Sequence, residues 1–222
     1  MIDTIQQIAL WALPVLVAII FHEVSHGWVA YRLGDPTAAR MGRLTLNPIA
    51  HIDPIGTILL PALLIISNAP FLFGYAKPVP VNFHNLRNPK RDMVWVASAG
   101  PVMNLLLASS CILVLKIGLP LIAAGTIDSS ASGLVNFLAP VALMAKNGVL
   151  INVVLAVFNA LPLPHWTGQS GGGITSRTLP SMLARAEPYG FLILIILLMT
   201  HALDKIIGPP IDFLINFYFK FL

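Results

Sequence analysis

The sequence has little charge and almost no cysteine. Lys, Arg, Asp and Glu make up 10% of the 222 residues, 57% are hydrophobic, and the mean hydropathy is +0.83. Soluble domains carry about a quarter charged residues, so water is not the main solvent of this chain. Cys111 is the only cysteine, which excludes an intrachain disulfide and a cysteine-built zinc site. A metal site would therefore use histidine and carboxylate.

Long polar stretches are also missing. Apolar runs close to the roughly 20 residues that a helix needs to cross a membrane alternate with short segments rich in proline, glycine and charge. The net charge of +4 could indicate nucleic-acid binding, but the basic residues lie in short loops beside apolar runs, where they orient a membrane protein. We therefore expect a lipid bilayer around the chain, no nucleic-acid partner, and a single integral membrane domain over residues 1–222.

The apolar runs predict an all-α polytopic membrane protein with about five to six membrane helices. We expect these helices over residues 4–33, 55–73, 93–116, 135–161 and 189–203, with an amphipathic or membrane-embedded piece over 206–222. Gly42–Pro48 has the alternation and the β-branched residue of a short strand. The first helix is therefore expected to be followed by a short re-entrant or β-hairpin element.

The positions of the basic residues predict the orientation of the helices. Three regions read as cytoplasmic because they contain Arg32, Arg40, Arg43, Arg87, Lys90, Arg91, Arg177 and Arg185. Residues 119–145 contain no Lys or Arg and read as external. Residues 55–81 must then enter and leave at one face or cross twice. Irregular backbone is tolerated at membrane depth where protein or water covers it, so this element is predicted to line a water-filled site.

A motif typical of zinc hydrolases lies inside the first apolar run. His22 and His26 are four residues apart, so they share one helix face and suit two adjacent corners of a zinc tetrahedron. Glu23 adjoins them and is one of two glutamates in the chain. Zinc lowers the pKa of a bound water, and the carboxylate takes its proton. The alternative is a set of packed polar groups, which is costly in an apolar span unless something satisfies them.

Phe21–Gly27 resembles the active-site helix of the site-2 protease family, the intramembrane zinc metalloproteases. Four further segments resemble the minimal prokaryotic members that lack a PDZ domain: Gly42–Pro48, His51–Gly56, Lys77–Val81 and Ala99–Leu105. The resemblance implies a multi-pass protein of a prokaryotic cell membrane. It also implies Zn²⁺ as cofactor, His22 and His26 as ligands, Glu23 as the catalytic residue, and membrane proteins with a transmembrane segment as substrates.

The family takes its third zinc ligand from a motif of the form Asn-x-x-Pro-x-Pro-x-Leu-Asp-Gly. Asn159, Pro162, Pro164 and Gly168 match this motif in register. Trp166 and Thr167 occupy the positions of Leu and Asp. A threonine hydroxyl is a poor substitute for a carboxylate, and catalytic zinc ordinarily has three protein ligands and a water. The departure puts the third ligand in doubt.

Three interpretations of Thr167 compete. In the first, the chain is a pseudoprotease that keeps the fold for binding or regulation. In the second, His165 or another residue replaces the missing ligand. In the third, the coding sequence is misread locally: the bases GCACTGGACGGGC encode Ala-Leu-Asp-Gly in one frame and His-Trp-Thr-Gly one base on. The last hypothesis also explains why residues 165–178 look unlike the family, whereas Leu179–Pro180 and Glu187–Phe191 resemble it again.

Other polar residues have weaker roles in these predictions. By resemblance, Asn104 and Asn159 contact the substrate strand or an oxyanion; interhelical hydrogen bonds are an equally good alternative. His51 and Asp53 precede Pro54, and turn chemistry favours a capping or turn role over a catalytic one. A helical substrate must be unwound before its backbone is attacked, so Lys77–Val81 is expected to pair with it as an added strand. Besides a pseudoprotease, a metal transporter is a distant alternative.

Overall fold

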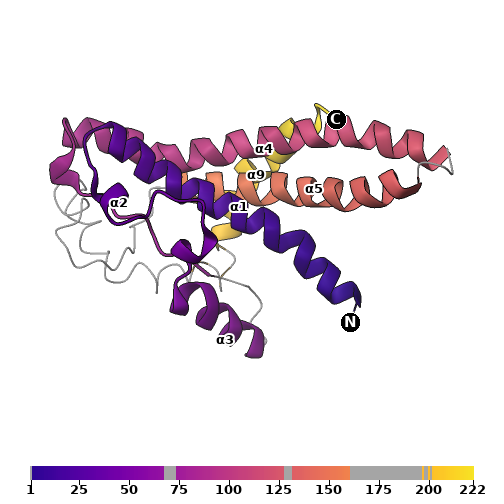
Figure 1. The fold of residues 1–222 in the computed structure, drawn as a ribbon, viewed down its shortest axis with the longest axis horizontal. Coiled ribbons are helices and arrows are strands. Elements are labelled where there is room, and N and C mark those ends of the chain that lie inside the picture. The colour runs from indigo at the N-terminus through magenta and orange to yellow at the C-terminus, as the bar shows by residue number, and fades with distance from the viewer. Residues whose placement is uncertain (1, 68–73, 128–131, 161–196, 198–199, 201) are drawn as a thin grey trace. The chain divides into compact units, whose positions relative to one another are not determined.

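The computed structural model describes residues 2–67, 74–127, 132–160, 197, 200 and 202–222 (Figure 1). Within these residues the regular structure is helical and contains no strand, so the predicted all-α class is confirmed. The chain divides into two compact units, and the prediction of a single domain stays a prediction. Unit 1 holds Met1–Ile19, Pro101–Phe158 and Ile207–Leu222, and unit 2 holds Ile20–Gly100 and Asn159–Ile206.

The first helix, α1 (Ile2–Arg32), covers almost the residues that the sequence predicts. It continues through Pro14 and stops just before Gly34, whose backbone φ is +113°. Residues with a side chain rarely adopt this conformation, so a glycine is the natural terminator here. The second half of α1 belongs to unit 2 and carries the histidine motif.

Two more long helices follow, α4 (Pro89–Ile127) and α5 (Ser132–Ala160), and in unit 1 they lie side by side (Figure 1). The second matches the predicted 135–161 closely, whereas the first continues well beyond the predicted end at Lys116 and passes through Pro120. In an apolar medium no water can satisfy an uncoiled backbone, so the helical state persists even across a proline.

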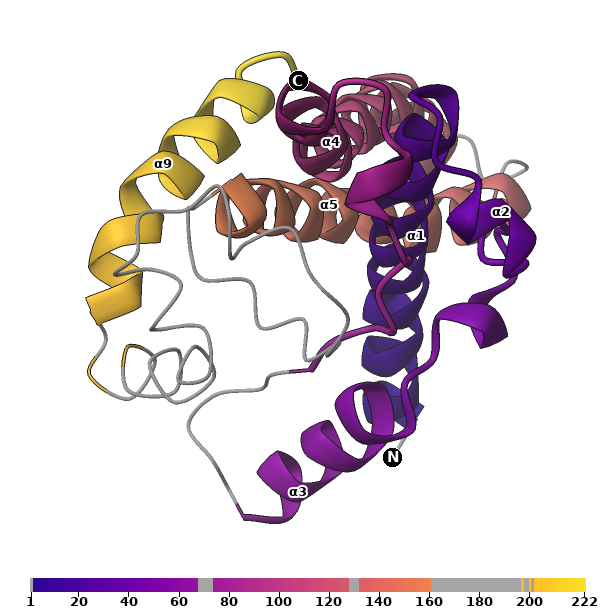
Figure 2. The same ribbon diagram turned by 90° about the vertical axis from the view of Figure 1, so that its left-hand side faces the viewer.

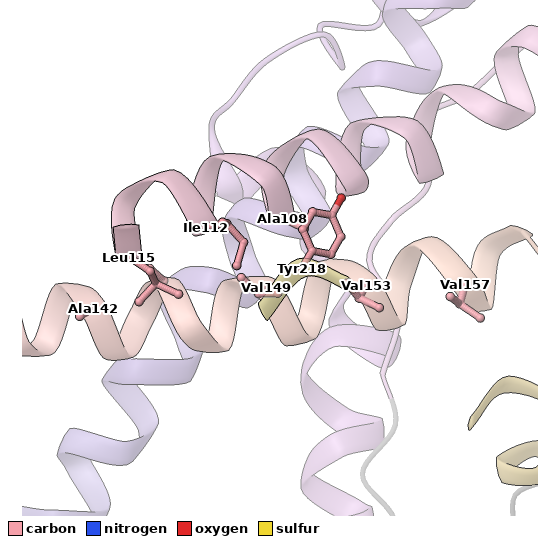
Figure 3. Close-up of a cluster of buried hydrophobic side chains, with 9 residues drawn as sticks. Ala108, Ile112, Leu115, Ala142, Val149, Val153, Val157 and Tyr218 are labelled. Carbon is pink, nitrogen blue, oxygen red and sulfur yellow. The ribbon is translucent and has the colours of Figure 1, made fainter. Parts of the chain in front are cut away.

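The core of unit 1 lies between α4 and α5 (Figure 3). The side chains that face one another there include Ala108, Ile112, Leu115, Val149 and Val153. Tyr218 of α9 (Ala202–Phe219) reaches the same cluster, and its hydroxyl donates a 2.8 Å hydrogen bond to the carbonyl oxygen of Leu105. The predicted last piece over residues 206–222 is therefore a helix that packs on this pair.

In unit 2, α1 is followed by short elements. They are α2 (Thr37–Arg40), a 3-10 turn (Pro48–His51), a π-helical turn (Pro54–Leu59) that runs into α3 (Leu60–Ile66), and a second 3-10 turn (Phe83–Asn85). Residues 41–47 form turns and irregular backbone, so the hairpin alternative is not confirmed. The apolar helix Pro54–Ile66 is shorter than a membrane span, and its re-entrant placement stays a prediction.

The segment over residues 77–87 runs back along the second half of α1 (Figure 2). Three of its backbone N–H groups donate to that helix or its end: Val79 to Glu23, Asn82 to Asp35, and Arg87 to the carbonyl oxygen of Leu33. Leu86 adds an apolar contact because it is buried with Ala30 of α1 and Val96 of α4. The segment is thus attached to α1 along a stretch that begins at the motif.

Three helical stretches in the described part of the chain are long and apolar enough to cross a membrane: Gln6–Arg32, Pro89–Gly125 and Gly133–Ala160. The chain is a membrane protein. The predicted total of five to six spans is not confirmed. The helix expected over residues 189–203 lies almost wholly outside the described residues.

Candidate active site

His22 and His26 come together on one face of α1, as their spacing predicts. Their Nε2 atoms are 3.0 Å apart and the ring centroids are 4.6 Å apart, with an angle of 80° between the planes. His22 is buried and His26 is half-buried. Two imidazole nitrogens thus point at one place rather than out of the helix in different directions.

The backbone of α4 sets the orientation of His26. Its Nδ1 lies 2.6 Å from the carbonyl oxygen of Val96. Because a carbonyl only accepts, Nδ1 carries the hydrogen and Nε2 presents its lone pair toward His22. Histidines that bind a metal commonly donate their second ring nitrogen in this way. This contact therefore prepares His26 as a ligand.

Gly100 of α4 provides the space that the two rings occupy. A Cβ atom built on Gly100 would collide with both imidazoles, its nearest atoms being Cε1 and Nε2 of His22 and Nε2 of His26. The rings of the motif thus fill the place of the missing side chain.

The two histidines fit a zinc ion as a pair of ligands. At zinc–nitrogen distances of about 2.0–2.1 Å, two nitrogens of a tetrahedral site are roughly 3.3 Å apart, close to the observed 3.0 Å. The residues that the structure describes contain no group of three His, Cys, Asp or Glu side chains able to hold a metal. His165 and Thr167, the candidates for the third position, lie outside the described residues.

Glu23 is held by the segment that lies along α1. Its Oε2 accepts a 2.8 Å hydrogen bond from the backbone N–H of Val79. Glu23 itself is half-buried, whereas Val79 is buried. This hydrogen bond from a buried residue restricts the rotation of the Glu23 carboxyl group.

Gly27 lets this segment come close to α1. A Cβ on Gly27 would lie 2.6 Å from Cδ2 of Leu44 and 2.6 Å from Cγ1 of Val79, closer than real Cβ contacts. Gly27 follows the motif directly in the chain. The site is thus bordered by two glycines, Gly27 and Gly100, each of which admits side chains from a neighbouring element.

The asparagines predicted to contact substrate lie in different surroundings. Asn104 is fully buried in unit 1, where its Nδ2 donates to Oδ1 of Asn152 at 2.7 Å and to the carbonyl oxygen of Ala18 at 3.3 Å. Asn159 is exposed near the end of α5. The structure thus gives Asn104 the interhelical hydrogen bonds that were the alternative to substrate binding, and its contact with substrate stays a prediction.

Asp53 and His51 take structural positions. Oδ1 of Asp53 accepts hydrogen bonds from the backbone N–H groups of Ile55 and Gly56, so Asp53 caps the turn that starts at Pro54, as expected. The Nε2 of His51 lies 2.8 Å from the carbonyl oxygen of Thr45.

Sequence reasoning did not identify the Val79 N–H, the Val96 carbonyl or the side chain of Arg43 as parts of this site. The first two are backbone groups, which every residue type has, so no signal in the sequence distinguishes them. Arg43 was counted only as an orienting charge. Arg43 is in fact buried, with 8% of the residue exposed, and its Nη2 donates to the carbonyl oxygens of Lys77 and Pro78.

Two bacterial relatives of this chain are named as zinc metalloproteases. The chain is 34% identical over 208 residues to a Bacillus subtilis protein named putative zinc metalloprotease YwhC, a match that covers 90% of this chain and 84% of the relative. It is 30% identical over 197 residues to a Mycolicibacterium smegmatis protein named putative zinc metalloprotease Rip2, covering 86% and 66%. No protein-family model and no solved structure matches. The chain belongs to the site-2 protease family of zinc metalloproteases.

Proposed function

We propose that this protein hydrolyses peptide bonds within or near transmembrane segments of other membrane proteins in a prokaryotic cell membrane. The observation that carries the proposal is the pair of Nε2 atoms 3.0 Å apart, one residue away from a carboxylate and inside an apolar helix. Ionisable groups are rare inside membrane helices and usually mark a functional site. The names of the relatives agree with a zinc-dependent protease.

The residues of α1 divide the chemistry between them. His22 and His26 would hold zinc through Nε2, and His26 would keep its orientation through the Val96 carbonyl. When bound, zinc supplies a Lewis acid that acidifies water at neutral pH. Glu23 would accept the proton of the attacking water at its carboxylate and pass it to the leaving amine. The Val79 N–H holds one oxygen of that carboxylate in place.

A substrate helix has to unwind before it reacts, because helical hydrogen bonds bury its backbone. We propose that the extended substrate pairs with residues 77–81 as an added strand, the usual way in which a chain with exposed main-chain groups binds a peptide. Part of this stretch is already engaged: the N–H groups of Lys77 and Val79 donate to His51 and Glu23, and the carbonyl oxygens of Lys77 and Pro78 accept from Arg43. Pairing would therefore use the remaining groups of the stretch.

Cleavage of single-span model substrates in proteoliposomes tests the proposal. Wild-type protein should cut at least one member of a panel of such substrates, and a zinc chelator should stop the reaction. Glu23→Gln should bind as much zinc as the wild type but lose roughly 10²–10⁴-fold in kcat, the range for removing a general base. Full cleavage by Glu23→Gln would show that this carboxylate is not the base.

A second function, that of a pseudoprotease which binds or regulates membrane proteins, is supported by one observation, the threonine at position 167. With two histidines alone the zinc site lacks a ligand. Resequencing the coding DNA across residues 165–178 separates a genuine Thr167 from a misread frame. If Thr167 is genuine, activity that appears only in Thr167→Asp identifies a pseudoprotease, whereas wild-type activity means that another group supplies the ligand.

A further inference from the structure

Arg43 is a buried cation outside the histidine motif. It follows α2 and Gly42, and its side chain is 8% exposed. Its Nη1 donates to the carbonyl oxygen of Ala50, and its Nη2 donates to those of Lys77 at 2.7 Å and Pro78 at 3.3 Å. Burying a charge is costly unless hydrogen bonds compensate, and here three carbonyl oxygens accept from Nη1 and Nη2, while Nε is buried without a hydrogen-bond partner. Such a group ties together the segments that supply those carbonyls.

The segment that Arg43 holds is the one that reaches Glu23. Lys77 and Pro78, whose carbonyls Arg43 binds, come directly before Val79, whose N–H donates to Oε2 of Glu23. The N–H of Lys77 also donates to the carbonyl oxygen of His51, in the turn that Arg43 contacts through Ala50. The chain of contacts therefore runs from Arg43 through two carbonyls to one amide and then to the carboxylate.

The residues around Val79 favour a fixed position for its amide. Pro78 and Pro80 flank it, and a proline restricts both its own φ and the backbone of the residue before it. Val79 is buried against Gly27, where its Cγ1 fills the space of a missing side chain. The Pro78 carbonyl and the Val79 N–H belong to one planar peptide group, so a displacement of that carbonyl also moves the amide that reaches Glu23.

We propose that Arg43 is a positioning residue for Glu23: by holding the carbonyls of Lys77 and Pro78, it directs the Val79 N–H at the carboxylate. The catalytic consequence of this inference rests on the proposed protease function. The contact between Val79 and Glu23 exists whether or not the chain turns over substrate. A purely structural role for Arg43 would change stability without acting selectively on the bond between Val79 and Glu23.

Hydrogen exchange at the Val79 amide tests the contact without any turnover. The full-length protein is labelled with ¹⁵N-valine in detergent, and the Val79 signal is assigned by its loss in Val79→Ile. The amide should be protected in the wild type and should exchange at least about tenfold faster in Glu23→Ala, which removes its acceptor. Arg43→Gln should accelerate it similarly, Arg43→Lys less, and Arg40→Gln, which removes an exposed positive charge close by, should not.

The exchange of buried valines elsewhere separates positioning from unfolding. Val96, buried in unit 2 with Ala30 and Leu86, and Val149, in the core of unit 1, should keep wild-type protection in Arg43→Gln. If Arg43→Gln unfolds the protein, the exchange rates of Val79 and of the buried valines are compared in Arg43→Lys instead, because this variant retains the charge. Wild-type exchange at Val79 in a folded Arg43 variant, or in Glu23→Ala, overturns the inference. An acceleration at Val96 equal to that at Val79 also overturns it, because it would show a general loss of structure in unit 2.

Kinetics then test the consequence, using the wild type, or Thr167→Asp if only that variant cleaves. Arg43→Gln should lower kcat roughly 10- to 100-fold, the usual effect of losing a group that orients a catalytic side chain, with zinc content unchanged and KM within about threefold. Val79→Pro, which removes the N–H, should lower kcat similarly, and adding Arg43→Gln should cost little more. Additive losses would overturn the inference. Absence of cleavage in every variant counts instead against the protease function.

Discussion

Gly100 of α4 lies so close to His22 of α1 that the imidazole occupies the space of a Cβ atom. This close approach explains why α4 has a glycine at position 100: any side chain there would push the His22 ring aside. His26 approaches the same position with its Nε2. The absence of a side chain at Gly100 is thus part of what brings the two Nε2 atoms together.

We predict that Gly100→Ala weakens zinc binding. The new methyl group would collide with both imidazoles, and relieving the overlap should separate the two nitrogens and destabilise the fold by about 1–3 kcal/mol, as overpacking commonly does. Zinc affinity, measured by competition with a chelator, should fall roughly 10- to 100-fold, the size of effect seen when groups that orient ligands are changed.

Gly118→Ala is the matched control for this variant. It lies in the same helix, and a Cβ there meets no atom within 4 Å. Alanine at that position should leave zinc affinity unchanged and, by the difference in helix propensity, stabilise the helix by about 0.5–1 kcal/mol. Equal zinc affinity in the two variants would disprove the crowding argument at Gly100.

A second prediction concerns the buried pair of Asn104 and Asn152. Asn104→Ala leaves Oδ1 of Asn152 without its donor in an apolar core, so the free energy of unfolding should fall by about 1–3 kcal/mol. Zinc content should not change. In an active protein KM should stay within about threefold, because the asparagine bonds to other helices. A large rise in KM with unaltered unfolding would instead support the predicted contact with substrate.

A third prediction concerns acid stability and Asp35, which lies beyond the membrane stretch of α1. Burial alone would raise the pKa of this carboxyl, but hydrogen bonds from Thr37, Asn85 and Asn82 outweigh it and hold the pKa below the ordinary value. A depressed pKa stabilises the fold above the pKa of the unfolded chain, about 3.9, and this stabilisation is lost as pH falls through the folded pKa.

Asp35→Asn isolates that contribution. Unfolding midpoints of the wild type and the variant, measured in detergent from neutral pH to about pH 3, should differ most near neutrality and converge below about pH 4. The variant should be less stable near neutrality because its amide presents a donor where a carboxylate oxygen accepts from the Asn82 N–H. A difference between the two proteins that does not vary with pH would contradict this account.

The long helices could be predicted from the sequence because apolar composition and length decide them. α1 ends at Arg32, within one residue of the end predicted from the sequence. The predicted end of α4 at Lys116 was wrong. Neither a lysine nor Pro120 ends this helix, because an apolar medium offers no water to satisfy an uncoiled backbone. The short irregular elements between α1 and α4 have no periodic pattern, so only their turn residues, such as Asp53, could be anticipated.

The candidate site was only half predictable. His22, Glu23 and His26 are local in sequence, and one helical turn fixes their common face. The contacts that orient them come from 56 and 70 residues further along the chain and are made by backbone atoms of Val79 and Val96. Such contacts depend on the tertiary fold and cannot be predicted from the types of the residues that make them.

The zinc content per chain decides whether the paired histidines of α1 are a metal site. Wild-type protein, Thr167→Asp, and Thr167→Asp combined with His22→Ala would be purified in detergent and analysed for metal. We predict about one zinc per chain in Thr167→Asp, where two histidines and a carboxylate complete the ligand set, and almost none once His22 is removed. Zinc that persists without His22, or its absence from Thr167→Asp, would show that the paired histidines of α1 are not a zinc site.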